Sequence, residues 1–302
     1  MSFIEFLVKF QQEIITSLIF IVISVGLLAF LAIAQSKEKK AKKSIIGGLL
    51  SVIAIIAGIT VLLAIQEKVV EVDGVDVIQK IGFYEILIVD FVFVVVYTAI
   101  SFVMLRTHRY GEESHKITTK KVALLGVIIG FASVLMLAGI PIMPAAPYLK
   151  LEISSLIIFM VLIWFDFKSA IVVSLATNVI HVFMPSLSAP IIPFLDEGVN
   201  FLATMAFLLP PAIVLSKRNE SEVPSSKKVL IATAIGVAFT TVFMVLYNAF
   251  INLPIIYRFE MPFITVLEIF GLFNILKWGT AFIVINLLWR KLYNLKDIRN
   301  QE

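Results

Sequence analysis

The sequence contains no cysteine and carries little charge. Only 15% of its 302 residues are charged, whereas 60% are hydrophobic. A soluble domain needs about 25% charged residues to cover its surface. Without cysteine, the chain forms no disulfide and offers no thiolate to a metal ion or a substrate. The apolar residues gather in runs of about 20 residues, the length that crosses a bilayer as a helix. These features exclude a soluble globular fold and predict an all-α, polytopic membrane protein.

Motifs of several enzyme classes are also missing. The chain has no G-x-x-x-x-G-K-[ST] phosphate loop, so it does not hydrolyse ATP by that route. Its three histidines, His108, His115 and His181, lack the spacing of a metal site. No serine, histidine and acid are arranged for nucleophilic catalysis. We therefore expect a protein that is not an enzyme, with no cofactor, no metal and no nucleic-acid partner.

Hydropathy predicts nine membrane-spanning helices. They cover residues 14–34, 44–65, 83–105, 121–140, 153–165, 169–184, 198–216, 229–250 and 263–289. With the N-terminus outside, nineteen of the 25 basic residues fall on the cytoplasmic side, five fall outside and Lys277 lies within a span. Because cytoplasmic loops are enriched in Lys and Arg, this distribution predicts a multi-pass plasma-membrane protein with a cytoplasmic C-terminus. A cleaved signal peptide is the alternative for the first span, although residues 1–13 lack a basic region.

A polar, charged segment at residues 106–120 divides the chain into two parts. Residues 1–105 form a three-helix membrane segment to which the sequence assigns no role. Residues 121–302 carry the other six helices. In the first part, Asp90 lies inside the third span, where a charge costs about 2.5–3.5 kcal/mol. We interpret it as a carboxyl group that faces other helices or stays protonated.

Lys277 lies near the middle of the ninth span. An ammonium group at this depth needs a partner or a polar cavity, so it is a candidate functional residue. Asn274, three residues earlier, shares its helix face, and Asn248 lies at the outer end of the eighth span. These groups suit a neutral ligand rich in hydroxyl or carbonyl groups. The alternative is a structural set of hydrogen bonds between helices, in which Lys277 pairs with Asp166 or Glu268.

Prolines are concentrated in the predicted outer loops of the six-helix part. Eight lie there, against one in the inner loops, Pro224. Because proline fixes φ and lowers the entropy cost of ordering a loop, these loops suit a pre-formed ligand pocket. The alternative is that the prolines only end helices.

Small residues follow one face of the fourth span. Ala123, Gly126 and Gly130 are spaced at i, i+3 and i+7. Such a stripe lets another helix approach closely. That helix belongs either to this chain or to a partner protein.

Four short segments of the six-helix part follow a family pattern. They are Pro-Tyr-Leu-Lys-Leu-Glu-Ile-Ser-Ser at 147–155, Thr-Asn-Val-Ile-His at 177–181, Asn248 followed by Pro254, and Asn274-x-x-Lys277. With these segments, residues 119–290 resemble the substrate-binding S components of energy-coupling factor (ECF) vitamin transporters, in particular the riboflavin-specific ones. Ser155 and Thr177 depart from the riboflavin-specific pattern.

The resemblance implies a subunit that captures riboflavin at the outer face of the membrane. It also implies docking to a transmembrane T component driven by two ATPase subunits. Riboflavin is then the transported ligand rather than a cofactor. The ligand contacts that it implies are Asn248, Asn274, Lys277, Pro147, Tyr148 and Leu149, and the docking contacts are Ala123, Gly126 and Gly130. The alternatives are another vitamin or a flavin nucleotide as the ligand, or a membrane scaffold protein that transports nothing.

Overall fold

The computed structural model describes residues 118–143, 149–184, 195–215 and 224–298, two strands between residues 67 and 80, and isolated positions from 86 to 100. It consists of two compact units. One unit comprises Met1–Ala99 with Phe250–Glu260, and the other comprises Ile100–Ala249 with Met261–Glu302. The first two predicted spans and most of the third lie outside the described residues. The count of nine spans and the domain boundary at 106–120 therefore stay predictions.

The first unit contains a β-hairpin between the second and third predicted spans. Strand β1 (Glu67–Val72) pairs antiparallel with β2 (Val75–Lys80), so that Glu67 lies opposite Lys80 and Val72 opposite Val75. Both strands are rich in valine, which favours extended backbone. The intervening Asp-Gly pair is the sequence that two-residue hairpin turns prefer. The sequence of this segment therefore carries a recognisable hairpin signal.

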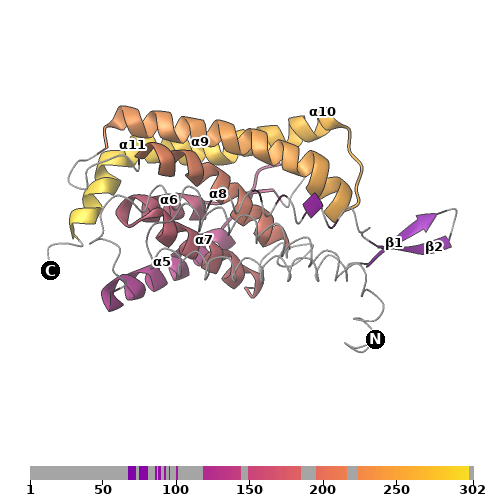
Figure 1. The fold of residues 1–302 in the computed structure, drawn as a ribbon, viewed down its shortest axis with the longest axis horizontal. Helices are drawn as coiled ribbons and strands as arrows, with labels where there is room; N and C mark the ends of the chain where they lie inside the picture. The colour runs from indigo at the N-terminus through magenta and orange to yellow at the C-terminus, as the bar shows by residue number, and fades with distance from the viewer. Residues whose placement is uncertain are drawn as a thin grey trace, which may run out of the picture. The chain divides into compact units, whose positions relative to one another are not determined.

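The second unit contains the predicted six-helix part (Figure 1). Its first five helices are α5 (Thr119–Leu137), α6 (Ser154–Trp164), α7 (Phe167–Val182), α8 (Leu195–Leu215) and α9 (Ser226–Tyr247), and α9 continues as the π-helix η1 (Asn248–Ile256). The last is built from α10 (Phe263–Val266), η2 (Leu267–Gly271) and α11 (Leu272–Ile298). Short strands β3 (Ile140–Pro141) and β4 (Lys150–Leu151) pair between α5 and α6. The prediction of an all-α fold is confirmed.

Four of the described helices are long and apolar enough to cross a membrane, by length and composition. They are α5, α8, α9 with η1, and the helix from α10 to α11. Helices α6 and α7 are apolar but shorter, at 11 and 16 residues. At 1.5 Å per residue, α6 covers only about 16 Å, roughly half of a bilayer core of about 30 Å. The residues that precede α6 therefore lie inside the apolar layer rather than at its surface.

Side chains cap the described helices and stabilise one of their junctions. The Thr118 hydroxyl accepts a hydrogen bond from the Lys121 backbone N–H, and the Asp166 carboxylate accepts one from the Ser169 N–H at 2.6 Å. Asp166 also pairs with Lys121 Nζ at 2.8 Å. Burial acts to raise the pKa of Asp166, but the hydrogen bonds from Lys121 and Ser169 and the charge of Lys121 hold that pKa below its usual range. Asp166 is therefore the partner of Lys121 and not of Lys277.

Helix α8 lies at the centre of the second unit, packed against α6, α7 and α9. The Phe207 ring of α8 stacks on Trp278 of α11 at a centroid distance of 4.8 Å and lies 6.1 Å from Phe159 of α6. All three rings are buried. Aromatic contacts of this kind add to the free energy gained from burial alone. The aromatic core thus joins α11 and α6 to α8.

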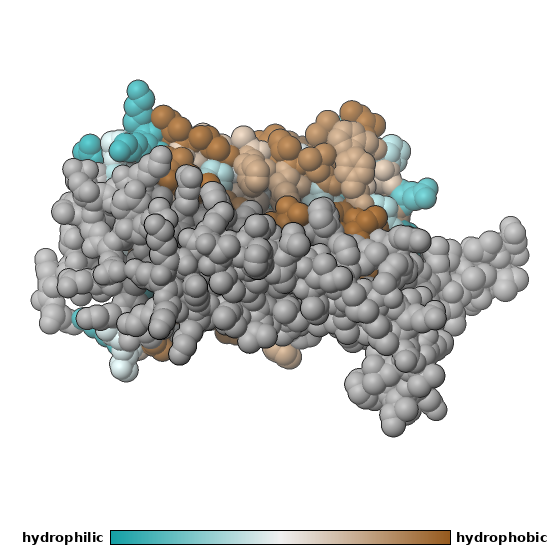
Figure 2. Space-filling view, in the orientation of Figure 1, coloured by the Kyte–Doolittle hydropathy of each residue, from teal (hydrophilic) through white to brown (hydrophobic). Residues whose placement is uncertain are grey.

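The outward faces of α9 and α11 are apolar. Figure 2 shows hydrophobic side chains covering this side of the second unit, with hydrophilic ones at both ends. The exposed apolar residues include Ile235, Phe239 and Val242 on α9 and Ile275, Ile283 and Leu287 on α11. Soluble monomers rarely expose an apolar patch of this extent. Lipid is the solvent that this surface suits, as expected of a multi-pass membrane protein.

Gly236 generates the first testable prediction, because α9 approaches α8 closely at this residue. A Cβ atom at Gly236 would lie 2.7 Å from the Phe207 carbonyl oxygen. We expect Gly236→Ala to destabilise the protein by about 1–3 kcal/mol through overpacking, seen as a lower Tm in detergent. Gly126→Ala on α5 is the matched control, since no described atom lies within 4 Å of its Cβ position. An equal loss of Tm in both variants would contradict the packing described above.

Candidate functional site

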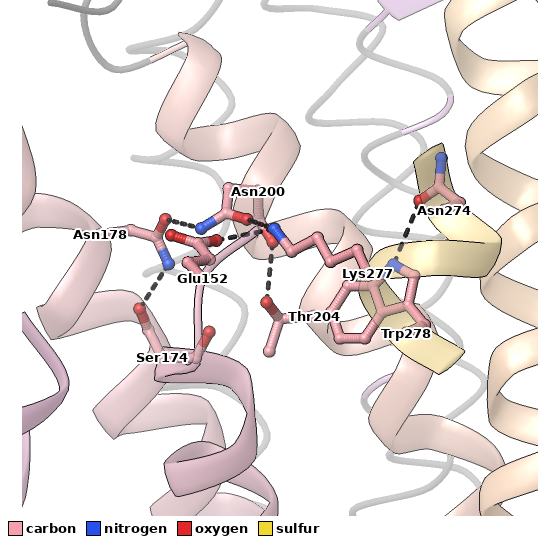
Figure 3. Close-up of polar contacts among 8 residues, drawn as sticks. All are labelled: Glu152, Ser174, Asn178, Asn200, Thr204, Asn274, Lys277 and Trp278. Carbon is pink, nitrogen blue, oxygen red and sulfur yellow. Dashed lines mark hydrogen bonds and ion pairs between the residues drawn. The ribbon is translucent and has the colours of Figure 1, made fainter. Parts of the chain in front are cut away.

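Lys277 lies inside the bundle and bridges two other elements. Its Nζ donates a hydrogen bond to Glu152 Oε1 at 2.7 Å and to Asn200 Oδ1 at 3.0 Å (Figure 3). The side chains of Lys277 and Glu152 are each 8% exposed. Lys277 comes from α11, Asn200 from α8, and Glu152 from the residues just before α6. One buried ion pair with an amide beside it therefore joins three parts of the second unit.

The network continues into α7. Asn200 Nδ2 donates to Asn178 Oδ1 at 3.1 Å, and Asn178 Nδ2 donates to the Ser174 carbonyl at 2.8 Å. The Thr204 hydroxyl donates to the Asn200 carbonyl at 2.9 Å. Figure 3 shows these groups converging between α7, α8 and the Lys277 side chain. We call Glu152, Asn178, Asn200 and Lys277 the Lys277 cluster.

A second polar pair lies one turn along the same α7–α8 interface. His181 Nδ1 lies 3.1 Å from Glu197 Oε1. His181 is three residues from Asn178 and Glu197 is three from Asn200, so the two pairs are successive rungs between the helices. Both side chains are largely buried. The α7–α8 interface is therefore polar at two levels.

The short helix α6 explains why Glu152 meets Lys277. Trp164 Nε1 donates to the Leu292 carbonyl at 2.9 Å, which fixes the end of α6 beside α11. Measured from that contact, the first residue of α6, Ser154, lies ten residues or about 15 Å away, and Lys277 lies fifteen residues or about 22 Å away along its helix. Both distances end well inside a core of about 30 Å. Glu152 is thus buried at nearly the depth of Lys277, although the sequence placed it at the outer boundary of a span.

Aromatic rings surround the Lys277 ammonium group. Its Nζ lies 5.4 Å from the centre of the Trp278 ring and 5.9 Å from that of Phe273. Rings at this distance attract a cation through their negative faces. Trp278 Nε1 in turn donates to Asn274 Oδ1 at 3.1 Å, while Asn274 Nδ2 donates to the Phe270 carbonyl at 2.7 Å. Asn274 therefore orients Trp278, and its connection to Lys277 runs through that ring.

Of the other predicted ligand residues, one is buried, one is half-buried and two lie outside the described residues. Asn248 is buried at the start of η1 and donates to the Met244 carbonyl at 2.7 Å. Leu149 is half-buried next to β4, and its carbonyl accepts a hydrogen bond from Ile142 N at 3.4 Å. Pro147 and Tyr148 lie outside the described residues. Their assignments, like those of Asn248 and Leu149, stay predictions.

Two buried hydroxyl groups on α7 have no hydrogen-bond partner within the described residues. They are Ser174 Oγ and Thr177 Oγ1. Leaving a buried polar group unsatisfied costs about 1–3 kcal/mol. Ser174 contributes its carbonyl to the Lys277 cluster, so its hydroxyl lies beside that network. These hydroxyls are groups that a polar ligand would satisfy.

Sequence reasoning found Lys277 but missed most of its partners. It did not select Asn200, although this residue is polar and falls inside the predicted span 198–216. It considered Asp166 and Glu268 as partners of Lys277, but Asp166 pairs with Lys121 and Glu268 is exposed. Only the length of α6 indicates that Glu152 is the residue at the right depth.

The small-residue stripe lies on an exposed face of α5. Ala123, Gly126 and Gly130 are all exposed. Among the described residues, no atom lies within 4 Å of a Cβ built at either glycine. Packing within the described part of the second unit therefore does not use this face.

Comparison with known proteins finds a family and two similar proteins. The sequence model of the family described as "ECF transporter, substrate-specific component" matches residues 120–289, more than half of the chain. The riboflavin transporter RibU of Streptococcus thermophilus (strain ATCC BAA-250 / LMG 18311) is 26% identical over 141 residues, which cover 47% of this chain and 64% of that protein. The match thus spans less than two thirds of RibU.

A solved structure of the S component of a bacterial ECF transporter is also similar. It has 26% sequence identity and a TM-score of 0.48, and the match covers 58% of this chain and 96% of that one. The family match, which covers more than half of the sequence, decides the assignment. The chain belongs to the substrate-specific components of ECF transporters.

Proposed function

We propose that this protein captures riboflavin at the outer face of the plasma membrane and hands it to an energising module for import. The module would consist of a transmembrane T component and two ATPase subunits. The N-terminus would lie outside and the C-terminus in the cytoplasm. The observation that carries the proposal is the Lys277 cluster, a buried polar network inside an S component that is similar to a riboflavin transporter.

The chemistry of the cluster matches the two halves of riboflavin. The flavin ring is flat and apolar on its faces but carries carbonyl oxygens and ring nitrogens at one edge. Trp278 and Phe273 place aromatic rings beside Lys277, which offers N–H donors to a carbonyl. The ribityl chain carries hydroxyl groups, which suit the amides of Asn178 and Asn200 and the hydroxyls of Ser174 and Thr177. Ligand sites commonly combine apolar walls with a few such polar groups.

Binding would exchange hydrogen bonds rather than add them. In this structure Lys277, Glu152 and Asn200 satisfy one another. A ligand carbonyl that takes the place of the Asn200 oxygen costs little net hydrogen-bond energy, whereas displacing Glu152 would leave its buried carboxylate unpaired. Affinity would then come mainly from the buried flavin ring, at about 25 cal/mol per Å² of apolar surface. The polar groups would supply specificity, because a ligand without matching atoms would leave them unpaired.

The direct test is riboflavin binding by the detergent-purified protein. We expect riboflavin to raise the Tm, since a ligand at 100 times its Kd stabilises the folded state by about 2.7 kcal/mol. Lys277→Ala should weaken binding by about ten- to a hundredfold, equivalent to one or two lost polar contacts. Glu268→Gln, at an exposed position of the same long helix, is the matched control and should bind normally.

A further variant separates loss of binding from loss of folding. Lys277→Ala leaves Glu152 buried without its cation, which destabilises a protein by about 3–5 kcal/mol. The double variant Lys277→Ala/Glu152→Ala removes both charges and should recover Tm but not riboflavin affinity. If a stably folded Lys277 variant binds riboflavin as tightly as the parent protein, the proposed site is wrong. If riboflavin does not raise the Tm of the parent protein, the proposed ligand is wrong.

The exposed stripe on α5 supports docking to the T component. Ala123, Gly126 and Gly130 leave an exposed face on which a second helix can approach closely. Glycine at two of the three positions removes the side chains that would otherwise hold the backbones apart. The family places S components beside such a partner, and this face is open in the described part of the chain.

Placing bulky side chains on this stripe should prevent transport without preventing riboflavin binding. In Gly126→Leu/Gly130→Leu, we expect riboflavin binding to be retained, because the substitutions lie on the exposed face of α5. Co-purification with a co-expressed energising module, and uptake of labelled riboflavin, should fall at least about tenfold. Val242→Leu is the control, since Val242 is also exposed but lies on α9 rather than α5. Normal uptake by the double leucine variant would show that docking uses another surface.

A further inference from the structure

Four basic residues lie at one end of the second unit, away from the Lys277 cluster. Lys227 and Lys228 are in the first turn of α9, and Arg290 and Lys291 are in the last third of α11. All four are exposed. Within the described residues, none of these four side chains forms a hydrogen bond or an ion pair. We call these residues the basic quartet.

Two contacts between α9 and α11 bring the members of the quartet together. Trp289 Nε1 donates to the Pro224 carbonyl at 3.1 Å, and Asn286 Nδ2 donates to Thr233 Oγ1 at 3.0 Å. These contacts show that the two helices run antiparallel. Measured from the second contact, the nearest member of the quartet lies five residues back along α9 and four residues on along α11, or about 8 Å and 6 Å. The basic side chains of both helices are therefore at the same level.

The charge of the quartet is not balanced by acidic residues of its own helices. Helix α9 contains no Asp or Glu, and α11 has none before Asp297, near its end. The flanking segments add no net side-chain charge, because residues 216–223 and 295–302 each contain two basic and two acidic residues. Asp166, at the same end of the unit, pairs with Lys121. This end of α9 and α11 thus carries a surplus of positive charge.

An exposed apolar surface begins directly beside the quartet. The exposed residues that adjoin it toward the middle of each helix are all apolar: Leu230, Ile231, Leu287 and Leu288. The predicted spans 229–250 and 263–289 begin and end at this point. Figure 2 shows the same change along this side of the unit, from hydrophilic side chains at the end to hydrophobic ones between. The quartet therefore lies where the apolar layer of a membrane meets the polar headgroups.

We infer that the basic quartet binds the headgroup of an anionic phospholipid, whose acyl chains lie on the adjoining apolar surface of α9 and α11. A phospholipid has the two parts that this surface matches, an anionic phosphate group and a long apolar tail. Clusters of about four to eight Lys and Arg beside a membrane span attract anionic lipids. An acidic protein segment would match the charges but not the exposed leucines beside them. The inference does not depend on which ligand the protein transports.

Helix stability does not explain the position of the two lysines. The N-terminus of a helix carries a partial positive charge, so acidic residues stabilise the first turn and basic residues destabilise it. The first turn of α9 has no acidic residue but contains Lys227 and Lys228. A lipid phosphate beside this turn would be attracted both by the lysines and by the backbone N–H groups of the helix end.

Thermal stability in defined lipids tests this inference. The full chain in a neutral detergent is titrated with dioleoyl phosphatidylglycerol or with dioleoyl phosphatidylcholine, which has the same acyl chains but no net charge. We expect phosphatidylglycerol to raise the Tm at a concentration at least about tenfold lower than phosphatidylcholine does. Sodium chloride at about 0.5 M should reduce this preference, because salt screens exposed charges.

Two variants separate the effect of charge from that of side-chain shape. Lys227→Gln/Lys228→Gln/Arg290→Gln/Lys291→Gln removes the four charges from exposed positions and should bind the two lipids equally. Lys227→Arg/Lys228→Arg/Arg290→Lys/Lys291→Arg retains the charges and should retain the preference. Lys168→Gln is the control and should also retain it, since Lys168 is an exposed lysine of α7, which packs against α5, α6 and α8.

Equal binding of both lipids by the parent protein, or an unchanged preference in the glutamine variant, overturns the inference. If that variant does not fold, Lys227→Gln/Lys228→Gln and Arg290→Gln/Lys291→Gln decide: each should reduce the preference, and no reduction in either overturns the inference. If the parent protein does not distinguish the lipids but the glutamine variant no longer co-purifies with a co-expressed energising module, the quartet binds a protein and the lipid assignment is wrong.

Discussion

The ion pair between Lys277 and Glu152 is the interaction on which the interior of this protein depends. A single ammonium inside a bilayer is strongly unfavourable unless it has a partner. Here the partner is a carboxylate at 2.7 Å, with the Asn200 amide as a second acceptor and two aromatic rings near the cation. The pair fixes α11 against the start of α6 and, through Asn200, against α8. Removing either partner of such a buried pair would leave an uncompensated charge, so the two residues act as a unit.

The architecture around the pair follows from unequal helix lengths. Helices α5, α8, α9 and α11 are long, whereas α6 has 11 residues and α7 has 16. A short helix ends inside the apolar layer, so the chain beside it brings polar residues to a depth that a full-length helix would fill with apolar ones. The β3–β4 pair lies directly before α6 and satisfies part of the backbone there. The same shortening therefore delivers Glu152 to the interior and makes room for a polar site.

Hydropathy and charge predicted much of this fold from the sequence. The six helices after residue 120 lie close to the predicted spans, because runs of apolar residues have one dominant solution in a bilayer. Lys277 was identified because a lone cation in such a run is conspicuous. Its partner was not, since pairing depends on relative depth, and depth depends on where each helix ends. Asn274 illustrates a second limit: helical spacing placed it on the face of Lys277, but its amide bonds to Trp278 and to its own helix.

The central claim is that the Lys277 cluster holds the ligand, and a crystal structure of the riboflavin complex tests it most directly. The account predicts electron density for the flavin beside Trp278, with Lys277 Nζ within hydrogen-bond distance of a flavin oxygen or nitrogen and its bond to Glu152 or Asn200 lengthened. Riboflavin bound at a different place, with the distances of 2.7 Å and 3.0 Å from Lys277 to Glu152 and Asn200 unchanged, would contradict it.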